Sequence, residues 1–178
     1  MRSRKVLVTT YYLQMTARDQ LNRRLSSLDG LALSQVTPPK PELNRFFYTT
    51  IGGDWHWVDR SSWTVGEWLK YLMQPEIETW LLSAGGLPAG YFELDAQSDG
   101  DVEIVYFGLL QRFTGMGLGG HLLTCAIERA WDLGARRVWL HTCSLDYPRA
   151  LSHYLSRGFD LYRQEESQRE LTLDSGSP

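Results

Sequence analysis

A glycine-rich segment in the second half of the chain joins a β-type run to an amphipathic helical pattern. Apolar and aromatic residues dominate 102–109, and glycines then recur between 115 and 120. From 117 to 133 the apolar residues keep helical spacing, and Gly134 stands where a helix C-terminal cap belongs. A helix that begins in a glycine loop presents free backbone N–H groups and the positive end of its dipole. The segment therefore predicts a site for an anionic group such as a phosphate.

The same glycines also satisfy the spacing G-x-G-x-x-G of a dinucleotide-binding turn. That turn follows its strand almost at once, whereas residues 110–114 separate the strand from the first glycine here. We therefore favour a phosphate loop of another kind over a Rossmann unit. A glycine-rich helix entry without any ligand is the remaining alternative.

The composition is that of one globular domain. With 178 residues, 43% of them hydrophobic and 22% charged, the chain is long enough to bury a single core. A net charge of −3 provides no basic field for a nucleic acid partner. Cys125 and Cys143 have no metal-ligand spacing, which indicates reduced thiols and no metal site. Residues 6–12 do not form a signal core, and no apolar run has membrane-spanning length, so we expect a soluble cytoplasmic protein without a membrane partner.

Local patterns predict an alternation of strands and helices. Strands are expected at 5–13, 31–36, 77–84, 88–95, 102–109 and 136–143, and helices at 42–51, 65–73, 117–133 and from Pro148 to Gly158. Thr64 and Glu67 have the spacing of a capping box for the second helix. The strands between 77 and 109 form an antiparallel meander, and the helix at 117–133 crosses over to a parallel strand. Residues 160–163 and 168–173 are expected to form a final hairpin.

This order of elements, with the pattern Ala150-x-x-x-Tyr154-x-x-x-Gly158-Phe159 near the end, resembles the GCN5-related N-acetyltransferase (GNAT) superfamily. The resemblance spans about 31–173 and is strongest from 103 to 159. Tyr147 replaces the asparagine that often begins the helix pattern.

The resemblance and the predicted elements together imply an α/β fold. It would be a mixed, mainly antiparallel twisted sheet of about six to seven strands, with a central parallel pair joined by a crossover helix and with helices on both faces. Residues 1–30 would add an N-terminal strand and extension packed on the domain. Residues 31–173 would form the acyltransferase-like domain, and 174–178 a loose tail.

In the superfamily the loop pattern Arg/Gln-x-x-Gly-x-Gly/Ala falls on residues 114–119, with Thr114 in place of the usual first residue. Thr114 still offers a hydroxyl donor. A second register, which starts at Arg112, stays open. The resemblance implies acetyl-CoA as acyl donor, bound by its pyrophosphate on the loop and by its pantetheine arm and thioester at the strand end. The expected donor-binding residues are Leu109, Leu110, Thr114, Gly115, Met116, Gly117, Leu118, Gly119 and Gly120.

Glu103 and Tyr154 are the expected catalytic residues. Glu103 precedes the loop at the spacing where the histone-acetyltransferase branch carries its catalytic glutamate, and desolvation would raise its pKa enough for a general base. Tyr154 stands where the family often has the tyrosine that protonates the leaving thiolate, and its pKa would be near that of a thiol. The alternatives are a solvent-facing glutamate, a tyrosine that only packs its ring, and a base that acts through a water chain.

An acceptor site is expected in a segment rich in tryptophan and carboxylates. Asp54, Trp55 and Trp57, followed by Trp63 and Trp68, would hold a cationic amine by cation–π and charge interactions. The alternative is that these tryptophans belong to the core.

These expectations converge on an N-acetyltransferase that moves an acetyl group from acetyl-CoA directly to a primary amine, without a metal. The acceptor would be a small-molecule or protein amine, and a homodimer is compatible with the sequence. The alternative is a non-catalytic CoA- or nucleotide-binding regulatory module, which would keep the loop without needing Glu103 or Tyr154. The sequence does not specify the acceptor, the acyl chain length or the oligomeric state.

Overall fold

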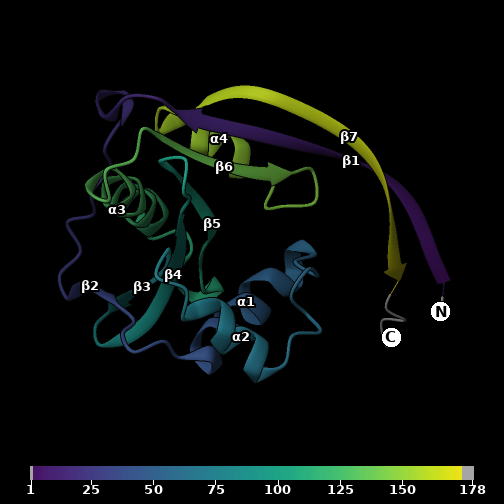
Figure 1. Ribbon diagram of the computed structural model, residues 1–178, viewed down its shortest axis with the longest axis horizontal. Helices are drawn as coiled ribbons and strands as arrows, with labels where there is room; N and C mark the ends of the chain where they lie inside the picture. Colours follow the sequence, from purple (N-terminus) through teal and green to yellow (C-terminus); the bar gives the residue numbers. More distant parts are fainter. Residues whose placement is uncertain (1, 174–178) are drawn as a thin grey trace.

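The computed structural model describes residues 2–173, so the tail predicted at 174–178 lies outside the described residues. A seven-stranded sheet in the order β2-β3-β4-β5-β6-β1-β7 forms the centre of the molecule (Figure 1). All neighbouring strands are antiparallel except β5 and β6, which confirms the predicted mixed sheet. The strands are β1 Arg2–Met15, β2 Leu31–Gln35, β3 Ile77–Ala84, β4 Leu87–Ala96, β5 Asp101–Leu109, β6 Arg137–Cys143 and β7 Asp160–Leu173.

The helices follow the predicted pattern closely. They are α1 Pro41–Gly52, α2 Val65–Leu72, α3 Leu118–Asp132 and α4 Ala150–Ser156. The capping box of α2 is present, since the Thr64 hydroxyl accepts from the Glu67 N–H and the Glu67 carboxylate accepts from the Thr64 N–H. The expectation that Pro148 lies in the first turn of the last helix is wrong, because α4 begins at Ala150 and Pro148 lies in the turn before it. Within residues 2–173, no helix combines the length and apolar character that a membrane span requires.

Helices cover both faces of the sheet, as predicted. Phe92 in β4 is fully buried in the core against the apolar stripe of α3, which includes Leu122 and Leu123. The adjacent Tyr91 points to the opposite face, where it stacks on Phe47 of α1 at 4.8 Å between ring centroids. This alternation separates a core under α3 and α4 from an aromatic core under α1 and α2.

The predicted final hairpin is wrong. Residues 160–173 form the single strand β7, and its partner is β1, with pairs from Gln14↔Asp160 to Arg2↔Leu173. The stretch from 164 to 167 holds none of the glycine, proline or asparagine residues that a tight turn favours, so nothing reverses the chain there. Residues 10–15 of β1 also pair with β6, and Thr9 still bonds to Ser144 directly after β6. Residues 2–8 pair only with β7 and form an arm that extends beyond the body (Figure 1).

Between β1 and β2 the chain runs across α3 and the end of α4. We call residues 21–28 the strap. Backbone N–H groups fasten the strap to the helices: Asn22 donates to the Arg157 carbonyl (2.9 Å) and Arg24 donates to the Thr124 hydroxyl (3.0 Å). The strap therefore lies against the beginning of α3, where the glycine loop ends.

Candidate active site

The parallel strands β5 and β6 separate near the middle of the sheet. Their pairing covers Asp101↔Arg137, Val102↔Val138 and Glu103↔Trp139. Beyond Glu103, β5 stays with β4 as far as Leu109, whereas β6 stays with β1 as far as Cys143. Beyond Glu103 and Trp139 the two strands are therefore no longer paired with each other, and the sheet opens between them. We call this gap the strand opening.

The glycine loop lies at the wide end of the strand opening. Gly115 and Gly117 have φ values of 78° and 75°, in the left-handed region that favours glycine, and a side chain at either position would point into open space. Gly117 is the N-cap of α3 and makes no side-chain cap hydrogen bond, and within residues 2–173 no side chain accepts from the N–H groups of the first turn. Leu109 at the end of β5 lies 3.9 Å from the position that a Cβ on Gly119 would occupy. Uncapped helix donors thus sit beside the end of β5, where an anion can reach them.

Two details of the expected donor site change. The Thr114 hydroxyl donates to the Gln111 carbonyl at 2.7 Å, so the expectation that it offers a free donor is wrong. The Leu110 N–H donates to the Ala89 carbonyl at 2.8 Å and is also occupied. Because successive residues of an antiparallel strand face opposite edges, the N–H of Leu109 then faces the strand opening.

Glu103 lies on the last rung before the strands separate. Its side chain is 14% exposed, and its Oε1 lies 3.8 Å from Nε2 of His141 on β6. Nε2 of Gln97 donates to its Oε2 at 3.3 Å. Asp95 is its cross-strand partner in β4. The glutamate therefore sits at the narrow end of the strand opening.

The pKa of Glu103 is raised to about 7. Burial is the main cause and Asp95 the second, while the positive charge of Arg60 opposes them. The raised pKa that the sequence predicted from desolvation is thus present. A carboxyl group with this pKa is half ionised at neutral pH, the condition that suits a general base.

Tyr154 approaches the strand opening from α4. Its ring packs against Phe107 of β5 and against Phe159, with 6.3 Å between ring centroids in both pairs. Within residues 2–173 its hydroxyl has no hydrogen-bond partner. Burial, and then the charge of Asp146, raise its pKa above the ordinary value of about 10. The expectation of a pKa near that of a thiol is therefore wrong, but the hydroxyl stays protonated at neutral pH.

The three expected acceptor residues lie in and just after the short 3-10 helix Gly53–Trp55 that follows α1. Asp54 is exposed, and Trp55 packs edge-on against Tyr147, with 5.4 Å between ring centroids. Trp57 is half-buried and packs on Tyr106 at 4.7 Å. The tryptophans are thus partly core residues with edges near the loop that leads into α4.

Trp63 and Trp68 surround a cation that belongs to the chain itself, which sequence reasoning missed. Arg60 is 7% exposed, and its Nη1 lies 3.0 Å from Oε1 of the buried Glu93. Its guanidinium lies over the rings of Tyr71, Trp63, Tyr106 and Trp68 at 4.1, 4.7, 4.7 and 5.4 Å. This part of the tryptophan segment is therefore a filled structural cage, and the lone arginine within an aromatic segment was the signal for it.

Asp146 is a second residue that sequence reasoning missed. It follows β6, and its Oδ2 accepts from the Thr142 hydroxyl at 2.6 Å while its Oδ1 accepts from Nε1 of Trp57 at 3.2 Å. No ion pair neutralises it within the part of the chain that is described. Since its charge also raises the pKa of Tyr154, it places a negative charge between the expected acceptor segment and the expected acid.

Residues 41–159 match the family model described as the acetyltransferase (GNAT) family. The chain belongs to this family. Membership confirms the resemblance seen in the sequence of this GNAT chain. No curated protein matches the chain.

Solved structures share the GNAT fold at low sequence identity. The GCN5-related N-acetyltransferase from Sphaerobacter thermophilus has a TM-score of 0.68 and 18% identity, over 93% of this chain and 51% of that one. The protein of the same description from Kribbella flavida has a TM-score of 0.62 and 20% sequence identity, over 97% of this chain and 61% of that one. An aminoglycoside acetyltransferase from a soil metagenome has a TM-score of 0.60 and 14% sequence identity, over 72% of this chain and 88% of that one. The GNAT chain thus spans about half to three fifths of the first two proteins, and these identities show the fold alone.

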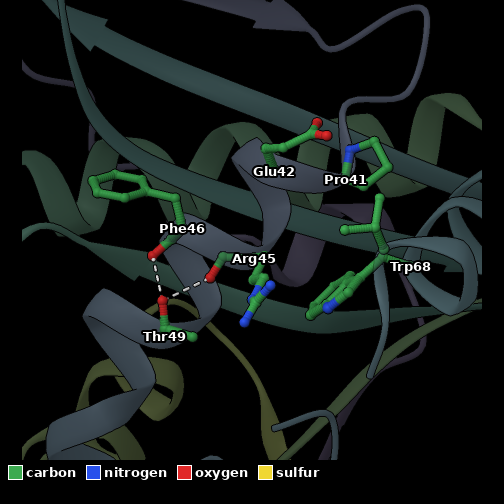
Figure 2. A pocket seen from close by; sticks show the side chains of 7 residues that line it. Pro41, Glu42, Arg45, Phe46, Thr49 and Trp68 are labelled. Atoms are coloured by element: carbon green, nitrogen blue, oxygen red, sulfur yellow. Dashed lines mark hydrogen bonds between the residues drawn. The ribbon is translucent and has the colours of Figure 1, made fainter. Parts of the chain in front are cut away.

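A cleft of about 280 Å³ lies between α1 and α2 of the GNAT chain (Figure 2). The residues that line it are Pro41, Glu42, Arg45, Phe46, Thr49, Val65 and Trp68. Thr49 donates to the carbonyls of Arg45 and Phe46, so its hydroxyl is engaged within α1 (Figure 2). None of the expected donor or catalytic residues lines this cleft, which is therefore separate from the strand opening.

Proposed function

We propose that the chain transfers an acetyl group from acetyl-CoA directly to a primary amine in the strand opening. The observation that carries the proposal is the chemical difference between the two ends of the strand opening. The uncapped donors of α3 lie at the wide end, and a buried glutamate with a pKa of about 7 lies at the narrow end. An elongated donor with an anionic tail and a reactive head fits that polarity.

The donor binds by its pyrophosphate to the N–H groups of residues 115–120. These donors need no positive side chain, because the helix dipole and the bare glycine backbone supply the attraction. The pantetheine arm then runs along β5 toward Glu103. The N–H of Leu109, which faces the strand opening, is the proposed backbone contact for the arm or the thioester carbonyl.

Glu103 acts as the general base. A primary amine is protonated at neutral pH, and its nitrogen must lose a proton before its lone pair can attack the carbonyl carbon. Glu103 takes that proton and releases it to solvent after the reaction. The C–N bond forms as the C–S bond breaks, so coenzyme A leaves as a thiolate. The nitrogen then gives its second proton to the thiolate or to solvent, which leaves a neutral amide with the acetyl group on the amine.

Tyr154 stabilises the departing sulfur. Because its pKa is raised, complete transfer of its proton to a thiolate is uphill, whereas a hydrogen bond from its hydroxyl to the developing negative charge is favourable. Its contact with Phe107 places its ring against the strand that carries the thioester in this proposal.

The acceptor is a cationic amine that enters beside Asp54, Trp55 and Trp57. Asp146, which has no ion-pair partner within the described residues, adds a negative charge next to Trp57. A positively charged amine is attracted by these carboxylates and by the tryptophan faces before it loses its proton.

Thiol release from acetyl-CoA with a panel of amines tests the proposal. Polyamines and aminosugars should release coenzyme A far faster than acidic amino acids such as glutamate, and mass spectrometry should find the acetylated amine. Preference for glutamate would contradict the cationic acceptor. Binding of acetyl-CoA without release by any amine would instead favour the regulatory module.

A further inference from the structure

Arg157 is a buried cation without an ion-pair partner among residues 2–173. It follows directly after α4, is 7% exposed, and forms no ion pair within residues 2–173. Its Nε is buried and has no hydrogen-bond acceptor. Burying a guanidinium without a compensating negative charge costs free energy. An anionic group of a bound ligand would supply that charge.

Two further polar side chains, His153 and Arg24, lie near Arg157. His153, one turn earlier on α4, has a buried Nε2 that forms no hydrogen bond with the described part of the chain. This atom lies 3.8 Å from the position that a Cβ on Gly119 would occupy. Arg24 of the strap lies against Gly120, with its Cδ 2.8 Å from the corresponding Cβ position. His153 and Arg24 therefore lie at the first turn of α3, and Arg157 is close enough to interact electrostatically with both.

This gathering is electrostatically unfavourable without a ligand. The beginning of a helix is the positive end of its dipole, so cations there raise the energy. Burial lowers the pKa of Arg157, and the nearby charge of Arg24 lowers it further. Two neighbouring arginines, in contrast, have carboxylate partners on α3. Arg23 pairs with Glu128 at 2.7 Å, and Arg18 pairs with Asp132 at 2.8 Å.

We propose that Arg24, His153 and Arg157 form a second anion site, which holds the ribose 3′-phosphate of coenzyme A. This inference rests on the proposed function, in which coenzyme A carries the acyl group. The neutral loop donors serve the pyrophosphate, whereas a terminal phosphate monoester carries a charge of about −1.5 to −2 at neutral pH. Two guanidinium groups, which bind phosphate oxygens in pairs, and one imidazole match that charge and its acceptor oxygens.

Calorimetric titration with coenzyme A and with 3′-dephospho-coenzyme A tests the site. The unaltered chain should bind coenzyme A at least about tenfold more tightly, which corresponds to about 1.4 kcal/mol. Arg24→Gln should remove most of that preference and leave the affinity for 3′-dephospho-coenzyme A unchanged. Because Arg24 is exposed, this variant should fold normally. Arg157→Gln should act in the same way, with thermal unfolding as the check of its fold.

Arg23→Gln is the matched control. It removes the same charge from the same strap, but Arg23 is already paired with Glu128, so the preference for coenzyme A should persist. Equal affinities of the unaltered chain for both ligands would overturn the second anion site while leaving acetyl transfer intact. A preference that survives in Arg24→Gln would do the same. Failure to bind either ligand would instead contradict the proposed function itself.

Discussion

Glu103→Gln tests the base most sharply, because the substitution keeps the size of the side chain and removes its titration. With a pKa of about 7, the ionised share of Glu103 is about one tenth at pH 6 and about nine tenths at pH 8. At saturating amine and acetyl-CoA, the kcat of the unaltered chain should therefore rise about tenfold over that range. The glutamine variant should lose this rise, and its kcat at pH 8 should fall about a hundred- to ten-thousandfold.

The same substitution should stabilise the fold at high pH. The folded-state pKa is raised above the ordinary 4.5, so the contribution of Glu103 to stability is full below pH 4.5 and is lost as pH rises through 7. The difference corresponds to at most about 3 kcal/mol. Denaturant unfolding at pH 8 should give Glu103→Gln the larger free energy of unfolding, whereas the two chains should be similar at pH 4.5.

Asp95→Asn is the control for the cause of the raised pKa. Because Asp95 raises the pKa of Glu103, its removal should move the rise in kcat to lower pH while leaving the plateau at pH 8 in place. Two amines of different pKa separate this effect from ionisation of the acceptor. A rise near pH 7 that persists in Glu103→Gln would refute the assignment of the base.

Substitutions at three further positions test other parts of the account. Tyr154→Phe should keep the affinity for acetyl-CoA and lower kcat about ten- to a thousandfold; an unchanged kcat would return Tyr154 to the core. Gly117→Asp should weaken acetyl-CoA binding at least about tenfold more than Gly117→Asn, which has the same shape without the charge; equal effects would remove the phosphate from the loop. Arg60→Met should lower the free energy of unfolding by about 3–5 kcal/mol, because it leaves Glu93 buried without its partner, and Arg60→Met with Glu93→Gln should recover part of the loss; full stability of the single variant would contradict the structural role of the cage.

Elements built on local patterns could be predicted from the sequence. The apolar residues of β3 and α3 recur at the spacing of a strand and of a helix, so each element is visible in its own segment. The glycines at 115 and 117 mark the left-handed positions before α3. The raised pKa of Glu103 followed from its apolar neighbours on a strand. In each case the residues that decide the outcome lie close together in the chain.

Features that depend on distant partners could not be predicted. Strand β7 pairs with β1, which lies at the opposite end of the chain, and no pattern within 160–173 predicts that pairing. The cage around Arg60 needs Glu93 from β4 and Tyr106 from β5, which lie far from the tryptophan segment in sequence. Arg24 and Arg157 likewise meet only because the strap crosses the end of α4.

A crystal structure with acetyl-CoA tests the central claim, that the strand opening is the donor site, most directly. We expect the pyrophosphate on the N–H groups of residues 115–120, the pantetheine arm beside Leu109, and the acetyl group in the gap between β5 and β6 on the side of Glu103. Electron density for the cofactor outside this gap, for example in the cleft between α1 and α2, would contradict the account.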